Sequence, residues 1–284
     1  MLKLRHLQFS LGSRGGEIMT KFVRFTLHVW LLVALSLVRP TWATSFSNDQ
    51  SDLWWNASED GWGIQFVQRG KTIFATMFVY DTAGNPTWYV ATMDGSKPGG
   101  VLTFTGDLYA AHGPWFGTVP YNPAAFGAAK VGTMTWQKSA GEPGTLTYSV
   151  GGVNVSKGIT RQPIASDDYT GTYNAGLHLV DSGCTDPAKN GPIDGGDTLT
   201  ITQSGAAISL TFVKTGCTLS GTYAQNGQFG IVSGNYSCSS GDRGTFNLSN
   251  MNVTPYSMAA RLSTSSAIDG CQGGGQIGGV RNDQ

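Results

Sequence analysis

Aromatic and acidic side chains crowd the segment LWWNASEDGWGIQFVQRG, where Trp54, Trp55 and Trp62 flank Glu59 and Asp60. Two chemistries suit these residue types: stacking of indole rings on a flat ligand such as a sugar, and acid–base catalysis by paired carboxylates. Glycoside hydrolysis needs two carboxyl groups about 5 to 9.5 Å apart across a cleft. Neighbouring carboxylates in an Asn-Ala-Ser-Glu-Asp-Gly turn point away from each other, so we interpret Glu59 and Asp60 as turn residues.

Every second side chain of a β-strand points to the same face, and this two-residue period divides the aromatic residues between a core and a surface. Trp62, Ile64 and Phe66 share one face of a predicted strand, which indicates that Trp62 belongs to the core. Trp54 and Trp55 are neighbours, so on a strand they must point to opposite faces. One of the two is therefore left outside, and the sequence alone does not decide which.

Further aromatic residues follow the same rule. Trp88 and Tyr89 point to opposite faces, and Tyr80 is out of phase with the inward-facing residues that precede it. An outer aromatic set needs a covering partner: another domain, a second subunit or a ligand. The candidate ligand-binding residues are Trp54, Trp55, Glu59, Tyr80, Trp88 and Tyr89.

No catalytic residue, metal ligand or cofactor is predicted. His112 and His178 follow the first 43 residues, and neither lies near a convincing nucleophile, which argues against a Ser/His/Asp or Cys/His site. No glycine-rich loop stands between a strand and a helix, as phosphate binding would require. The enzyme alternative would use separated carboxylates, with these candidates: Glu59, Asp81, Asp94 and Asp107.

Residues 1–43 are predicted to be a signal peptide, with Met19 as the preferred start. Lys21 and Arg24 precede an apolar run over residues 27–38, and small residues stand before a cut after Ala43. The run is too short for a bilayer, which needs about 20 apolar residues. We therefore expect a periplasmic or secreted protein with no transmembrane segment in its mature form.

The charge balance argues against a nucleic-acid partner. Removing residues 1–43 takes away six of the 18 basic and one of the 18 acidic residues, leaving 12 against 17 and a net charge of about −5. Nucleic acid selects for basic surfaces. The remaining partner hypotheses are a polysaccharide and a hydrolase.

Composition divides the mature chain in two. All tryptophans after residue 43 precede residue 165, and all four cysteines follow it. Runs of period two rich in Val, Ile, Thr and aromatics, broken by Gly, Asn and Asp, predict an all-β protein. We expect a Trp-rich domain over residues 45–162 and a disulfide-bonded domain over residues 167–284.

Two tandem small antiparallel β-barrels of about eight strands each are the preferred architecture, and β-sandwiches are the alternative. In the second half eight short strands with one apolar face are predicted near residues 169–176, 198–203, 207–213, 218–224, 229–237, 244–251, 257–263 and 275–280. The segment from Ile64 to Ile73 matches that from Leu199 to Ile208 in spacing, which suggests tandem repeats. Each segment contains a short hairpin turn with glycine.

An up-and-down barrel would bring Cys184, Cys217, Cys238 and Cys271 to one end. Equal separations of 33 residues favour the pairs Cys184–Cys217 and Cys238–Cys271. Four cysteines allow three pairings, and Cys217–Cys238 with Cys184–Cys271 is the rival. A zinc site is the less favoured alternative, because no CxxC occurs and export implies an oxidising compartment.

A resemblance rests on WWNASEDGWG from Trp54, FATMFVYD from Phe74 and GNPTWY from Gly84. These motifs resemble a module that recurs in exported bacterial proteins without an established activity, and the resemblance covers most of residues 52–282. It implies an exported location and a β-rich fold, and it implies no catalytic residue.

Together these features predict an exported, non-enzymatic binding protein that presents an aromatic surface, with carbohydrate or another cell-envelope polymer as the ligand. A second hypothesis is an inhibitor of a hydrolase, with residues 110–128 as the loop that enters the target. A carbohydrate-active enzyme is the third hypothesis.

Overall fold

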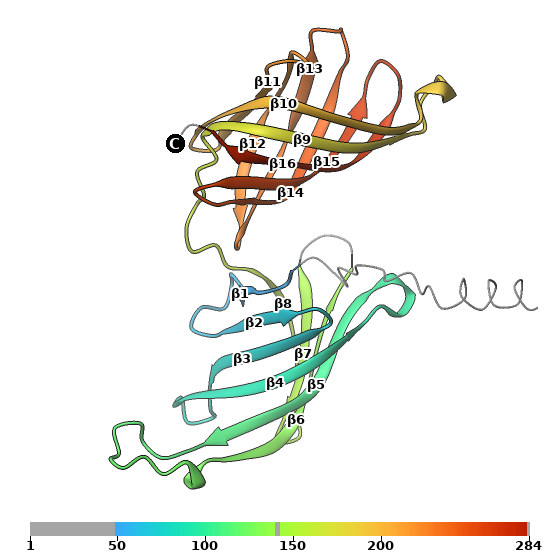
Figure 1. Ribbon diagram of the computed structural model, residues 1–284. Coiled ribbons are helices and arrows are strands. Elements are labelled where there is room, and N and C mark those ends of the chain that lie inside the picture. The colour runs from blue at the N-terminus through green and yellow to red at the C-terminus, as the bar shows by residue number, and fades with distance from the viewer. Residues whose placement is uncertain (1–48, 140–142, 283–284) are drawn as a thin grey trace, which may run out of the picture. The chain divides into compact units, whose positions relative to one another are not determined.

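The computed structural model describes residues 49–139 and 143–282. These residues form two closed antiparallel β-barrels of eight strands each, β1 to β8 and β9 to β16 (Figure 1). The predicted fold class of two tandem small barrels is thus confirmed. The predicted signal peptide, residues 1–43, lies outside the described residues.

Neighbouring strands in the sequence pair with each other throughout the first barrel, and β1 pairs with β8 to close it. Its strands are β1 (Asp52–Trp55), β2 (Gly63–Arg69), β3 (Thr72–Tyr80), β4 (Pro86–Ser96), β5 (Leu102–His112), β6 (Gly127–Lys138), β7 (Gly144–Val150) and β8 (Val153–Arg161). Two short 3₁₀ turns interrupt the connections, η1 (Pro98–Gly100) and η2 (Pro123–Ala125).

Alternation along the strands builds the core of this barrel. On β2, Ile64 and Phe66 are buried whereas Gln65 and Val67 are exposed, because successive side chains of a strand point to opposite faces. The ring of Trp54 packs edge-on against Trp136 with centroids 5.1 Å apart. Such aromatic pairs fill the interior of a small barrel efficiently.

The second barrel has the same up-and-down order, closed by pairing of β9 with β16. Its strands are β9 (Gly171–Ser182), β10 (Gly191–Ser204), β11 (Ala207–Phe212), β12 (Cys217–Asn226), β13 (Phe229–Cys238), β14 (Arg243–Val253), β15 (Ser257–Ser266) and β16 (Gln272–Arg281). A third 3₁₀ turn, η3 (Pro187–Lys189), lies between β9 and β10.

The two segments matched in the sequence form equivalent hairpins. Arg69 pairs with Thr72 across the β2–β3 turn, and Ser204 pairs with Ala207 across the β10–β11 turn. Gly70 in the first turn has a φ of 57° and Gly205 in the second also has a φ of 57°. This left-handed conformation favours glycine because a side chain would be strained there.

The disulfides correct the preferred pairing: the bonds are Cys184–Cys271 and Cys217–Cys238. Cys217 and Cys238 face each other across adjacent strands β12 and β13. Cys184 follows β9 and Cys271 precedes β16, the two strands that close the barrel. Adjacency in the sheet decides the bonds, and the equal spacing in the sequence does not, although all four cysteines do lie at one end as predicted.

Two disulfides are compatible with an oxidising compartment. Within residues 49–139 and 143–282, no helix has both the length and the apolar character that a membrane crossing requires.

Candidate functional site

The predicted aromatic residues divide between the interior and the exterior of the first barrel. Trp54 is fully buried, and its indole Nε1 donates to the Gln50 carbonyl at 3.0 Å. Trp54 therefore offers no surface to a ligand, and its neighbour Trp55 is the half-buried, outward member of the pair. Trp62 packs against the core, as period two predicts.

The outer surface of β3 and β4 carries exposed aromatic rings, which we call the outer aromatic face: Phe74, Phe78, Tyr80 and Trp88. Phe78 and Trp88 lie directly opposite each other in the two strands and are 54% and 45% exposed. Tyr89 belongs to the inner face, opposite Met77, and packs half-buried against the core. Tyr80 and Trp88 are thus the predicted residues that this surface presents.

Glu59 is engaged in a local ion pair. One carboxylate oxygen accepts a hydrogen bond from Trp62 Nε1 at 3.0 Å, and Lys157 Nζ lies 2.8 Å from the same oxygen. The hydrogen bond from Lys157 lowers the pKa of Glu59. A carboxylate kept ionised in this way is suited to holding the β1–β2 loop and unsuited to donating a proton.

The other carboxylates of the enzyme hypothesis also have local partners. Asp81 accepts hydrogen bonds from the backbone of its own hairpin turn, which lower its pKa. Asp94 accepts from the Thr72 hydroxyl at 2.9 Å, and Asp107 pairs with Lys130 at 2.7 Å. Each is accounted for by local structure.

A cavity of about 560 Å³ opens in the second barrel, at the end where the disulfides lie. We call it the calyx. Its walls are mainly apolar, as in pockets that bury small organic ligands, and are formed by Leu177, Leu179, Phe212, Leu219 and Leu262. Eight-stranded barrels have room for one such ligand when the side chains at one end do not fill the interior.

Asp181 places a carboxylate inside this apolar cavity. It continues the inward-facing series of β9 that includes Leu177 and Leu179. Gly273 lies opposite it on β16, where a Cβ atom would come within 2.7 Å of Asp181 Oδ1. Burial, together with the negative charge of Asp242, raises the pKa of Asp181, because both disfavour the ionised form.

Asp242 is held in place on the opposite wall. It accepts hydrogen bonds from Tyr236 Oη at 3.1 Å and from Ser266 Oγ at 2.8 Å. Burial raises the pKa of Tyr236 to about 12, so the phenol keeps its proton and remains a donor. These bonds orient the Asp242 carboxylate at the cavity.

The charges that line the calyx are unbalanced. Four carboxylates face one ammonium group, with these members: Asp181, Asp197, Asp242, Asp269 and Lys189. Lys189 is paired with Asp269 at 2.8 Å. Among the described residues, no cationic side chain forms an ion pair with Asp181 or Asp242.

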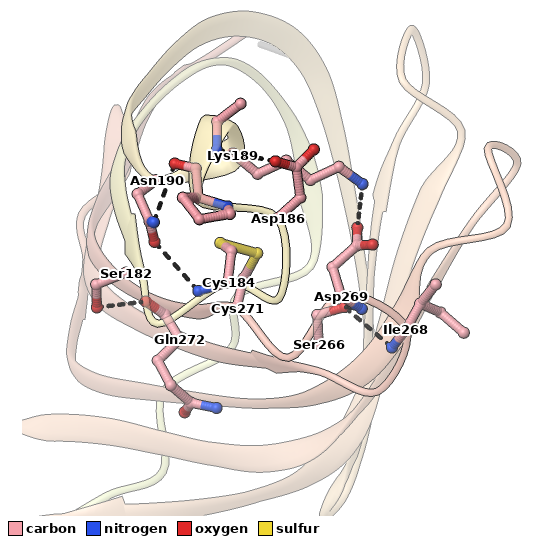
Figure 2. The surroundings of a disulfide bond; sticks show 12 residues. Ser182, Cys184, Asp186, Lys189, Asn190, Ser266, Ile268, Asp269, Cys271 and Gln272 are labelled. Carbon is pink, nitrogen blue, oxygen red and sulfur yellow. Dashed lines mark hydrogen bonds and ion pairs between the residues drawn. A yellow bond between two sulfur atoms is a disulfide. The ribbon is translucent and has the colours of Figure 1, made fainter.

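Covalent and ionic links hold the rim of the calyx. Figure 2 shows the Cys184–Cys271 bond beside η3, with Lys189 reaching Asp269 across the rim. Asn190 accepts from the Cys184 backbone N–H at 3.1 Å and donates to the Pro187 carbonyl at 3.0 Å. The β9–β10 and β15–β16 connections are thereby fixed, which preorganises the opening of the calyx.

The acidic and cysteine residues beside the Cys184–Cys271 disulfide do not suit a metal ion. Asp181, Cys184 and Cys271 bring their potential ligand atoms within 4.8 Å of one another. Both sulfur atoms are committed to a disulfide, however, and thiolates rather than disulfides bind zinc. This cluster therefore does not support the zinc alternative.

Sequence reasoning missed the calyx. An aspartate near a strand end, followed by Ser-Gly-Cys, is typical of a turn, and Asp181 carries no other mark. The alternation from Tyr173 through Leu177 and Leu179 to Asp181 is the signal that could have placed this carboxylate on the inner face of the barrel.

No family model, curated protein or solved structure matches this chain.

Proposed function

We propose that this protein is an exported, non-enzymatic binding protein, periplasmic or secreted, whose calyx holds a small organic cation with an apolar body. The observation that carries the proposal is an apolar cavity with an inward carboxylate, Asp181, that lacks a cationic partner in the described structure. The disulfides and the predicted signal peptide support export.

Electrostatics favours a cation over a neutral or anionic ligand. Burial and the negative charge of Asp242 both disfavour the ionised form of Asp181 and raise its pKa. A protonated amine between them would relieve this repulsion and form charge-assisted hydrogen bonds. The leucine and phenylalanine walls would cover its hydrocarbon part.

A calorimetric titration with ligands matched in shape tests the charge preference. We expect phenylbutylamine to bind at least about tenfold more tightly than phenylbutanol, a difference of one well-formed charged contact. Phenylbutyrate should bind most weakly. Equal affinities, or a preference for the acid, would refute the cation site.

The outer aromatic face supports a second candidate function, recognition of carbohydrate or another envelope polymer. Phe78 and Trp88 lie side by side on adjacent strands, and Tyr80 extends the exposed surface. Flat rings with one exposed face suit stacking on a planar ligand.

Tryptophan fluorescence, titrated with polysaccharides and peptidoglycan fragments, tests this second function. A saturable shift is expected that Trp88→Ala abolishes and that Thr92→Ala, on the same strand and also exposed, preserves. A panel without any shift, or a shift that Trp88→Ala leaves intact, would remove the candidate.

A further inference from the structure

The connection between β5 and β6, residues 113–126, is an exposed apolar loop, here called the aromatic loop. Trp115, Phe116 and Val119 are 69%, 86% and 91% exposed, and Tyr121 and Phe126 are also exposed. In Figure 1 this green segment extends past the neighbouring turns at its end of the first barrel. Large apolar side chains so fully exposed indicate a contact surface.

The loop carries no charged side chain. Between Asp107 and Lys130 the chain contains no Asp, Glu, Lys or Arg. Those two residues lie in the strands and pair with each other at 2.7 Å. If the loop entered a medium of low polarity, none of its side chains would carry a charge into that medium, so the large cost of burying a charge is absent.

Local hydrogen bonds hold the loop in two turns. The Thr118 N–H donates to the Trp115 carbonyl at 3.0 Å, and the rings of Trp115 and Phe116 lie 5.6 Å apart. In η2 the Asn122 side chain accepts from the Ala124 N–H at 3.1 Å. The backbone donors used in these turns need not be satisfied by a partner, which lowers the cost of burying the loop.

Other exposed apolar side chains lie at the same end of this barrel. Strands β3 and β7 run toward the same end as β5, so Tyr80 and the β7–β8 turn with Val153 accompany the loop. Tyr80 is 58% and Val153 64% exposed. The exposed acids Asp60 and Asp81 also belong to this end.

We propose that the aromatic loop inserts into the headgroup region of a phospholipid bilayer and docks the protein on a membrane surface. Trp, Tyr and Phe favour this interface, because their rings are apolar and the polar groups of Trp and Tyr remain hydrated. The affinity for the membrane then increases with the apolar area that the loop buries in it. The acids at this end predict a preference for zwitterionic over anionic lipid.

A hydrolase cleft is the competing occupant. An inhibitory loop anchors one or two side chains in a pocket, whereas here five large apolar side chains are spread over two turns. A bilayer surface accommodates all of them without a matching shape. The bilayer therefore accounts for more of the exposed surface than a cleft does.

Vesicle sedimentation of the predicted mature chain, residues 44–284, tests the proposal. Phosphatidylcholine vesicles should bind the protein, with little change when salt is raised, because no charge attraction is involved. Trp115→Ser/Phe116→Ser should lower the partition coefficient about tenfold or more. The double variant Tyr256→Ser/Val280→Ser, which changes exposed apolar residues of the second barrel, should bind as the unchanged protein does.

A spectroscopic readout locates the contact. Vesicles should shift tryptophan emission to the blue, and Trp115→Phe should reduce that shift while retaining most of the binding. Absence of binding to phosphatidylcholine would overturn the proposal, as would binding only to anionic vesicles that salt abolishes. Equal loss in the two double variants would also overturn it. Inhibition of a hydrolase without vesicle binding would favour the cleft instead.

Discussion

Asp181 is the residue on which the proposed function depends, and its environment suggests a conflict between binding and stability. The carboxylate lies among apolar side chains and near Asp242, which raises its pKa. The folded state therefore holds this proton more tightly than the unfolded state does. The protonated carboxyl group of Asp181 therefore contributes to the stability of the folded protein in acid. This contribution is lost as the pH rises through the raised pKa of Asp181 in the folded state.

We predict that Asp181→Asn makes the protein more thermally stable at pH 7. The amide carries no charge, so the penalty for burying a carboxylate beside Asp242 disappears. The gain should vanish below about pH 3, where the carboxyl is protonated in both states. Melting curves at both pH values, followed by circular dichroism, measure the effect, and a neutral-pH destabilisation would contradict it.

Sequence patterns at the residue scale predict faces but not their assignment. Period two places Trp54 and Trp55 on opposite sides, yet only the pairing of β1 with β2 and β8 decides that Trp54 is inside. The same limit applies to Tyr89, which the structure places on the inner face. Alternation is local, whereas inside and outside are properties of the closed barrel.

At the scale of elements, closure of the second barrel is reinforced by two disulfides with different loop lengths. Cys217–Cys238 spans 21 residues of sequence and Cys184–Cys271 spans 87. In the chain-entropy account, the longer loop restricts the unfolded chain more. The bond that joins the first and last strands of this barrel should therefore stabilise it more.

We predict that Cys184→Ser/Cys271→Ser lowers the unfolding free energy of the second barrel by about 4.5 kcal/mol, and Cys217→Ser/Cys238→Ser by about 3 kcal/mol. Urea unfolding followed by circular dichroism gives both values. Tryptophan emission serves as the control. Every tryptophan of the described structure lies in the first barrel, so tryptophan emission follows the urea unfolding of that barrel. The midpoint of this transition should be unchanged in both variants. The reverse order of effects would contradict the prediction.

The strands themselves were accessible from the sequence. The predicted strand over residues 229–237 matches β13 (Phe229–Cys238) to within one residue, because alternation and flanking turns define both of its ends. The disulfide pairing was not accessible, since equal spacing of cysteines carries no information about which strands become neighbours. Adjacency arises only when the sheet closes.

At the scale of the whole molecule, each barrel has its own apolar core and a different specialised end. The cores are separate clusters of buried residues, one centred on Trp54 and Trp136 and the other on Tyr173 and Leu199. The first barrel exposes the aromatic loop and the outer aromatic face, while the second contains the calyx. We propose contact with a surface for the first barrel and small-ligand binding for the second.

The calyx could not be predicted because a cavity is a property of the assembled walls. Composition and alternation predict a barrel of this size, but they do not predict whether large side chains fill its interior. Gly273 and Gly275 on β16 allow neighbouring strands to approach closely at the disulfide end, because a Cβ atom would clash with Thr264 at the first position and with the His178 backbone at the second. In the sequence these residues are part of an ordinary glycine-rich run.

The most direct test of the proposed function compares the affinity for phenylbutylamine of the unchanged protein, Asp181→Asn and Asp194→Asn. Asp194 lies in β10 on the outer surface, where it pairs with His178. We predict that Asp181→Asn weakens binding at least about tenfold, the value of one charged contact, and that Asp194→Asn leaves it unchanged. Equal affinity in all three proteins would show that the calyx carboxylate does not bind the cation.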